Sequence, residues 1–124
     1  MTSRLTNICI AAADPLSLAH FWCGVLAWEI ADQSDEGVSI GPVDGAWPVI
    51  DILPVPEPKL HKNRLHLDLR ADGISTSEEL KRLLDLGAST VDVGQSPEAT
   101  WVVLADPEGN EFCLLAMSVQ NVVQ

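Results

Sequence analysis

One order of elements occurs twice in this chain, and it restricts the fold more than any other feature of the sequence. Residues 6–12 alternate as a strand does, Asp14-Pro15 opens a helix, and apolar residues follow at helical spacing. The order returns about 60 residues later: residues 65–71 alternate, and Ser75 and Glu78 stand in capping-box register before a second helix. Each helix precedes three short strand candidates, at residues 28–32, 38–41 and 46–53, then at residues 90–93, 100–105 and 111–116. We therefore expect two βαβββ modules.

Two modules of this kind predict an α+β fold, because a solenoid needs three or more repeats to bury its faces. In each module the helix covers one face of the sheet, and the other face is free to curve against a second sheet or around a ligand. We expect a curved mixed sheet with a cleft for a small molecule. The 124 residues suit one domain, with modules at 1–54 and 65–117, a proline-rich linker at 55–64 and a tail at 118–124.

The composition excludes several classes of partner. Eighteen acidic side chains against seven lysines and arginines give a formal charge of −11, which repels phosphate backbones and anionic lipids. We therefore expect neither nucleic acid nor a membrane as a partner. The apolar stretch at residues 8–13 is too short for a signal sequence or a membrane span, so a cytoplasmic protein is expected. Cys9, Cys23 and Cys113 are an odd number of thiols without CxxC spacing, which favours buried, reduced cysteines.

Polar side chains at alternate positions along the predicted strands are expected to face the cleft. A strand alternates its side chains between two faces, so those on the face away from the helix can be read from the sequence. Internal symmetry makes Asn7 the counterpart of His66. It makes Asp51 roughly the counterpart of Glu111, which is the one carboxylate on the last strand. The full set of candidates is Asn7, Asp51, His66, Asp68, Arg70 and Glu111.

Several motifs resemble the vicinal oxygen chelate superfamily, which includes glyoxalase I, extradiol dioxygenases, and fosfomycin- and bleomycin-resistance proteins. The strongest matches are residues 63–70 (NRLHLDLR), 86–88 (LGA) and 105–112 (ADPEGNEF), with Asp14-Pro15 before the first helix. The chain looks closest to the bacterial glyoxalase-like subgroup. This resemblance implies the paired βαβββ fold and a homodimer. It also implies metal ligands at Asn7, His66 and Glu111, although the family usually has His, Gln or Glu at the first position.

The chemistry of these positions leaves two alternatives open. An imidazole and a carboxylate on neighbouring strands suit Zn, Mn, Fe or Ni, whose vacant positions bind two adjacent substrate oxygens. Asp51 would supply an anion that Asn7 lacks. A metal-dependent lyase, isomerase or dioxygenase-like enzyme acting on a small oxygenated substrate is then expected, with no catalytic residue assigned. Alternatively no metal is bound, and His66 and Glu111 hydrogen-bond to each other or to Arg70 in a polar pocket.

Other residues extend both hypotheses. Trp47 and Trp101 begin corresponding strands and are candidates for stacking on a ligand, while Trp22 and Trp28 are expected in the core. Asp68 and Arg70 are expected to form a charge pair that shapes the pocket. The cations of the linker, Lys59, His61, Lys62 and Arg64, either draw an anionic substrate or neutralise nearby carboxylates. The alternative function is a metal-free protein of the bleomycin-resistance type that sequesters a cationic or amphipathic compound.

Overall fold

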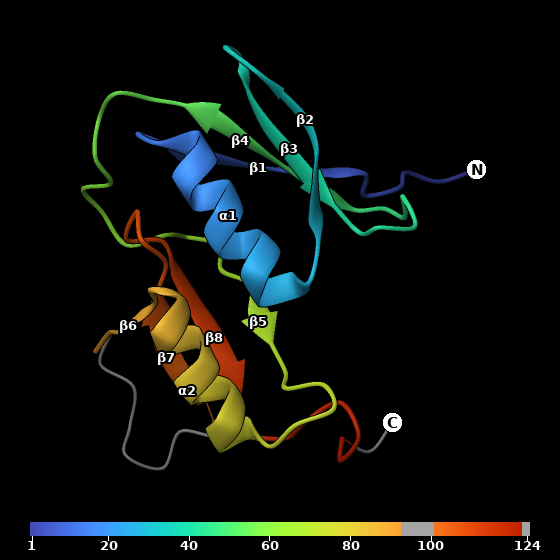
Figure 1. Ribbon diagram of the computed structural model, residues 1–124, viewed down its shortest axis with the longest axis vertical. Coiled ribbons are helices and arrows are strands. Elements are labelled where there is room, and N and C mark those ends of the chain that lie inside the picture. Colours follow the sequence, from blue (N-terminus) through green and yellow to red (C-terminus); the bar gives the residue numbers. More distant parts are fainter. Residues whose placement is uncertain (93–100, 123–124) are drawn as a thin grey trace. The chain divides into compact units, whose positions relative to one another are not determined.

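The structure is a computed structural model, and it describes residues 1–92 and 101–122. It contains two compact units, Met1–Pro58 and Lys59–Gln124, whose boundary falls within residues 55–64. Each unit has one helix and one four-stranded sheet, so the expected α+β plan of two βαβββ modules is confirmed (Figure 1). The outer ends of two predicted strands, residues 93 and 100, lie outside the described residues.

The first unit is built on a sheet in the order β1-β4-β3-β2, with β1 parallel to β4 and the other neighbours antiparallel. Its elements are β1 (Asn7–Ala12), α1 (Pro15–Leu26), β2 (Glu29–Ser34), β3 (Gly37–Gly41) and β4 (Val49–Pro54). The two parallel strands pair over all six residues. Gly37 enters β3 with φ of +142°, and a Cβ there would come within 2.5 Å of the Ile52 carbonyl oxygen, so this position requires glycine.

Helix α1 starts at a cap that its own sequence supplies. The Asp14 carboxylate accepts a hydrogen bond from Ser17 N at 3.2 Å, and Pro15 occupies the first turn, where no amide donor is needed. The helix packs one side against the sheet, and the core forms there from Leu18, Ala19, Phe21, Trp22, Val25, Val38, Ile40, Ile50 and Ile52. Because strand residues alternate, Asn7 and Cys9 lie on the face that α1 does not cover.

The second unit repeats the plan with a sheet in the order β5-β8-β7-β6, in which β5 is parallel to β8. Its elements are β5 (Asp68–Leu69), α2 (Thr76–Leu86), β6 (Ser89–Thr90), β7 (Trp101–Ala105) and β8 (Glu111–Leu115). The N-cap half of the predicted capping box is confirmed, because Ser75 Oγ accepts from Glu78 N at 3.1 Å; the Glu78 carboxylate accepts from the Ser75 hydroxyl, at 2.8 Å, instead of from the Ser75 backbone. The buried apolar residues of this unit are Ala71, Leu83, Ala88, Val103, Leu104, Ala105, Phe112, Cys113 and Leu114.

The first strand of the second unit is shorter than the sequence predicts. Residues 65–71 alternate as a strand would, yet β5 pairs with β8 only at Asp68 and Leu69. The reason lies in the preceding segment, where Lys59 Nζ and Asn63 N both bind the Glu111 carboxylate. The backbone bends at residues 64 and 65, directly after Asn63, so regular pairing with β8 begins only after this bend.

The burial of tryptophans and cysteines follows the prediction in part. Trp22 is buried, as predicted, and Trp28 is half-buried. Cys113 is buried and Cys23 is half-buried, whereas Cys9 is exposed, so the expectation of buried thiols is wrong for Cys9. The cause is its position in β1, on the face of the sheet opposite α1.

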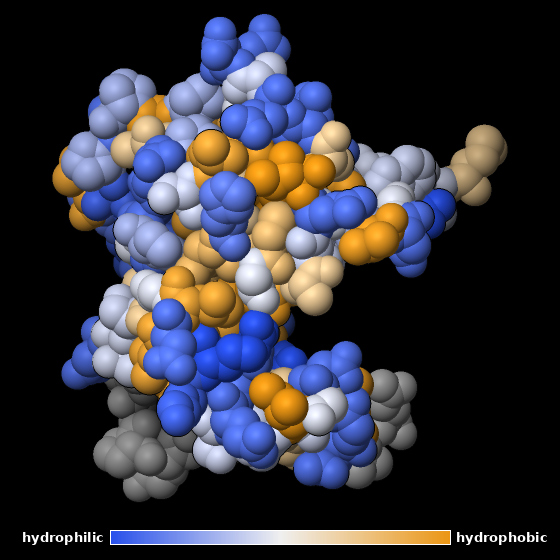
Figure 2. All heavy atoms as spheres, viewed as in Figure 1, coloured by the Kyte–Doolittle hydropathy of each residue, from blue (hydrophilic) through white to orange (hydrophobic). Residues whose placement is uncertain are grey.

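The surface of the chain is mostly hydrophilic on the face that Figure 2 shows, with hydrophobic side chains interspersed. Large apolar residues that are well exposed include Trp47, Leu60, Leu65 and Trp101. Within residues 1–92 and 101–122, no helix has the length and apolar character needed to cross a membrane.

Candidate functional site

Glu111 begins β8, and the turn before it sets its position. Asp106 N donates to Asn110 O and Gly109 N donates to Asp106 O, both at 2.9 Å. Gly109 has φ of +87°, the left-handed conformation that a turn at this point requires. Asp106 is buried, and its carboxylate accepts hydrogen bonds from Glu108 N, Asn110 N and the Asn110 side chain. A buried acceptor therefore holds the turn that directs Glu111 into the sheet.

The Glu111 carboxylate is bound at both oxygens by groups of its own unit. Lys59 Nζ lies 2.9 Å from Oε1, and Asn63 N donates to Oε2 at 3.1 Å. The Lys59 and Glu111 side chains are 21% and 12% exposed. Burial raises the pKa of Glu111, but it is outweighed by the hydrogen bonds from Lys59, Asn63 N and the backbone of Glu111 itself together with the positive charge of Lys59, and the pKa lies below its ordinary value. The prediction that linker cations neutralise carboxylates is confirmed for Lys59.

His66, Asp68 and Arg70 have different partners from those that the sequence suggested. His66 Nε2 lies 3.2 Å from Asp68 Oδ1, and both side chains are about half exposed. Arg70 Nη1 donates instead to the Met117 carbonyl oxygen at 2.9 Å. The expected Asp68–Arg70 charge pair is therefore replaced by a His66–Asp68 contact. His66 and Glu111, considered above as direct partners, each contact another side chain.

In the first unit, Asn7 and Asp51 lie together on the uncovered face of the sheet. Asn7 Nδ2 donates to Asp51 Oδ2 at 2.8 Å, and Ser39 Oγ donates to Asp51 Oδ1 in a short hydrogen bond. Strand register explains both contacts. Asp51 is paired with Ser39 in β3 and with Cys9 in β1, and Asn7 lies two residues before Cys9 on the same face. Both of these donors are neutral, so neither cancels the negative charge of the Asp51 carboxylate.

The register corrects one symmetry assignment. Asp51 pairs with Cys9, which is two residues after Asn7, and Cys113 pairs with Asp68, which is two residues after His66. The counterpart of Asp51 is therefore Cys113 and not Glu111. Each unit thus has an aspartate opposite a cysteine across its parallel strand pair, with the two residue types exchanged between the strands.

The two tryptophans proposed for ligand stacking are both accessible. Trp47 is 55% exposed and Trp101 is 40% exposed. The guanidinium carbon of Arg4 lies 4.8 Å from the centroid of the Trp47 ring, which is a cation–π contact. A hollow of about 510 Å³ in the second unit lies elsewhere, at the start of α2, and its lining includes Ser75 and Gln120 and none of the predicted site residues.

Comparison with known families decides the assignment of the chain. The sequence model of the glyoxalase-like domain matches residues 7–115, a stretch that runs from β1 to the end of β8. The chain belongs to the glyoxalase-like domain family. This confirms the resemblance drawn from residues 63–70 and 105–112. No curated protein sequence matches the chain.

Solved structures of the wider group share the fold. A glyoxalase/bleomycin resistance protein/dioxygenase family enzyme from Burkholderia phytofirmans PsJN has a TM-score of 0.67 at 15% identity, covering 90% of this chain and 97% of that one. The fosfomycin resistance protein FosX from Listeria monocytogenes, complexed with Mn(II) and sulfate, has 0.71 at 17%, covering 97% and 94%. Oxidase ChaP-H2 has 0.62 at 17%, covering 94% of each chain. Such identities establish the fold alone.

The residues at the positions that the resemblance assigns to a metal do not fit a divalent ion as they are arranged here. Asn7 is a neutral amide, and its nitrogen is committed to Asp51. The Glu111 carboxylate already contacts the Lys59 ammonium, which a divalent cation would have to displace against its own charge. Of the three positions, His66 keeps an exposed imidazole, which is paired with Asp68.

Sequence reasoning missed two partners in these contacts. Ser39 was not considered, although a correct register for the hairpin and β4 would have placed it beside Asp51. Asn63 acts through its backbone nitrogen, so its residue type carried no signal. Lys59 was noted as a linker cation, but its partner lies 52 residues away and could be found only from the folded chain.

Proposed function

We propose that this protein binds a small molecule without a metal ion at Glu111, as a binding or sequestering protein of the bleomycin-resistance type. The observation that carries the proposal is the Lys59–Glu111 ion pair at 2.9 Å. The ammonium group supplies at this carboxylate the positive charge that a metal ion would otherwise supply. Both side chains are largely buried, so solvent weakens the pair less than it weakens a surface contact.

The charge distribution favours a cationic ligand. The first unit has Arg4 as its one lysine or arginine, against eight aspartates and glutamates. The Arg4 guanidinium stacks on Trp47, so this ring already accepts a positive group from within the chain. Trp101 offers a second exposed indole. A flat aromatic cation would match the negative field of the first unit and its exposed Trp47 ring.

Calorimetry and tryptophan fluorescence with ethidium, a flat aromatic cation, test the proposal on EDTA-treated protein. We expect binding without added metal, weakened about fivefold in Trp47→Leu, because one exposed cation–π contact contributes about 1 kcal/mol. Fluorescein, an anionic dye, serves as the matched control and should not bind. The proposal fails if cationic aromatic compounds give neither heat nor a fluorescence change, or if they bind only after Mn²⁺ is added.

A metal-dependent lyase or isomerase acting on a small oxygenated substrate is the second candidate, favoured by the Mn(II)-containing FosX structure among the fold neighbours. Lys59→Met separates the two candidates, because it removes the cation from Glu111. On the proposed function, only this variant gains measurable Mn²⁺ affinity, and the control Lys62→Met does not. On the enzyme alternative, the unmodified protein binds Mn²⁺ stoichiometrically, and His66→Ala and Glu111→Ala each abolish the binding.

A further inference from the structure

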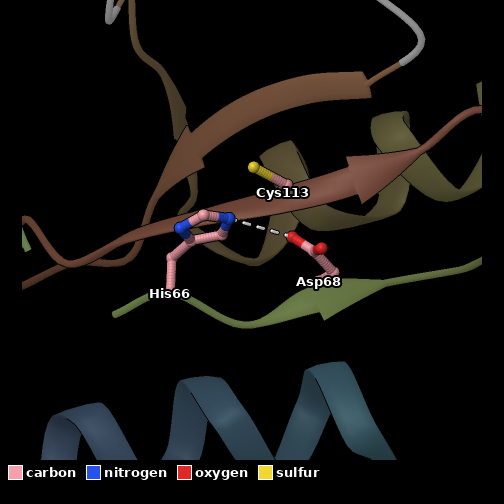
Figure 3. A group of neighbouring side chains, drawn as sticks. All are labelled: His66, Asp68 and Cys113. Atoms are coloured by element: carbon pink, nitrogen blue, oxygen red, sulfur yellow. Dashed lines mark ion pairs between the residues drawn. The ribbon is translucent and has the colours of Figure 1, made fainter. Parts of the chain in front are cut away.

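Three potential metal ligands meet on the second unit, and two of them, Asp68 and Cys113, lie outside the family's ligand positions. His66, Asp68 and Cys113 each offer one ligand atom, and these atoms all lie within 4.8 Å of one another. Figure 3 shows the imidazole and the carboxylate on one chain segment and the thiol on β8, all on the same side of the strands. From this cluster we infer that the chain has a binding site for a zinc-class ion at His66, Asp68 and Cys113.

The distances agree with tetrahedral coordination. Zinc binds nitrogen and oxygen at about 2.0–2.2 Å and sulfur at about 2.3 Å, so two ligands of one tetrahedron stand roughly 3.3–3.6 Å apart. His66 Nε2 and Asp68 Oδ1 are already 3.2 Å apart. The sulfur, within 4.8 Å of both, needs to move by only about 1 Å to complete the set.

The backbone keeps the three groups together. Asp68 and Cys113 are direct partners in the β5–β8 ladder, and Cys113 N donates to Leu67 O at 2.9 Å beside them. Side chains opposite each other on neighbouring strands stand about 4.5–5.5 Å apart at Cβ. His66 precedes β5 and is held beside Asp68 by their 3.2 Å contact. Sheet pairing thus preforms the Asp68–Cys113 half of the site.

Charge and softness also favour Asp68 and Cys113 over Asn7 and Glu111 as partners of His66 in binding an ion. One carboxylate and one thiolate balance a divalent cation, and the imidazole completes a donor set of nitrogen, oxygen and sulfur. A sulfur ligand selects zinc over the harder Mn²⁺. Lys62 acts electrostatically on Cys113, and its positive charge opposes the ion. As the zinc–sulfur bond forms, the Cys113 sulfur loses its proton to solvent.

Burial divides the site into a closed side and an open side. Cys113 is buried, whereas the His66 and Asp68 side chains are 47% and 49% exposed. An ion can therefore enter from solvent, and a water molecule can occupy the fourth position. This inference goes beyond the proposed function. The two can fail independently, because binding of the organic cation is measured in EDTA and binding of the metal ion at Cys113 is measured in its own titration.

Titration of the whole metal-free chain with Zn²⁺ and with Co²⁺, a spectroscopic probe for zinc sites, tests the inference. We expect one ion per chain and a thiolate-to-cobalt charge-transfer band, since sulfur is a ligand. Cys113→Ser should remove the band, and Asp68→Asn should weaken Zn²⁺ affinity at least tenfold. Asp68 is exposed, so the second variant keeps the test valid if replacement of the buried Cys113 impairs folding.

Matched variants separate this site from the alternatives. Cys9→Ser and Cys23→Ser should keep the charge-transfer band, and Glu111→Gln should keep the Zn²⁺ affinity. The inference is overturned if the unmodified chain takes up no stoichiometric ion, or if the band persists in Cys113→Ser. It is also overturned if Glu111→Gln abolishes binding while Asp68→Asn leaves it unchanged, which would assign the ion to the family positions.

Discussion

In the first unit the Asp51 carboxylate accepts hydrogen bonds from Ser39 and Asn7, whereas in the second unit the Glu111 carboxylate is bound by Lys59 and by Asn63 N. Neutral donors satisfy an anion without cancelling its charge, but an ammonium group cancels it. Two modules with the same order of elements therefore present different electrostatics. Duplication of a fold does not duplicate its chemistry.

The parallel strand pairs of the two units also differ. β1 and β4 pair over six residues, while β5 and β8 pair over two. In the second unit, the chain before β5 supplies Lys59 and Asn63 to Glu111 instead of extending the ladder. The shorter ladder is thus accompanied by two contacts to one carboxylate, one from the Lys59 side chain and one from the Asn63 backbone.

The largest difference in stability is expected between two turns that each contain an aspartate acceptor, Asp106 in the second unit and Asp44 in the first. Asp106 is buried and accepts several hydrogen bonds in the turn before Glu111, so Asp106→Ala should lower the free energy of unfolding by about 2–4 kcal/mol. Asp44 in the first unit is exposed and accepts one bond from Ala46 N, so Asp44→Ala should cost about 0.5 kcal/mol. Urea denaturation measures both.

Asp106→Asn serves as the control, because it keeps one acceptor oxygen and should lose less stability than Asp106→Ala. Equal losses in Asp106→Ala and Asp44→Ala would contradict the assignment of Asp106 as the group that holds the turn.

A smaller effect, with a pH signature, is expected at Glu111. Its pKa is lowered in the folded chain, so its stabilisation is present above the ordinary value of 4.5 and is lost as the pH falls through the folded value. Glu111→Gln should therefore cost about 1–2 kcal/mol at pH 7, and this cost should shrink in acid. Asp51→Asn, which meets neutral donors, should cost about 0.5–1 kcal/mol at pH 7. If the free energies of unfolding of the unmodified chain and of Glu111→Gln differ by the same amount at every pH, the contact is contradicted.

The sequence predicted features that depend on local chemistry. The N-cap at Ser75 and the uncovered face that holds Asn7 both follow from spacing and alternation. Strand register was not predictable, because a shift of two residues preserves the same alternation. That is why Asp51 was matched with Glu111 and not with Cys113.

The chain before β5 shows the other limit of prediction. Residues 65–71 alternate well enough for a strand, but contacts made by Lys59 and Asn63 decide where pairing begins. Those contacts join segments about fifty residues apart, and nothing in local propensity encodes them. The same long-range contact gives Glu111 a lysine partner that no local pattern predicts.

The claim that a lysine compensates Glu111 is tested most directly by carbon NMR of the Glu111 carboxyl group during a pH titration in EDTA. In the unmodified chain the midpoint should lie below 4.5, and in Lys59→Met it should rise, because burial then acts with less opposition. Lys62→Met, the control, should leave the midpoint nearly unchanged. A midpoint at or above 4.5 in the unmodified chain, or one that Lys59→Met does not move, would contradict the account.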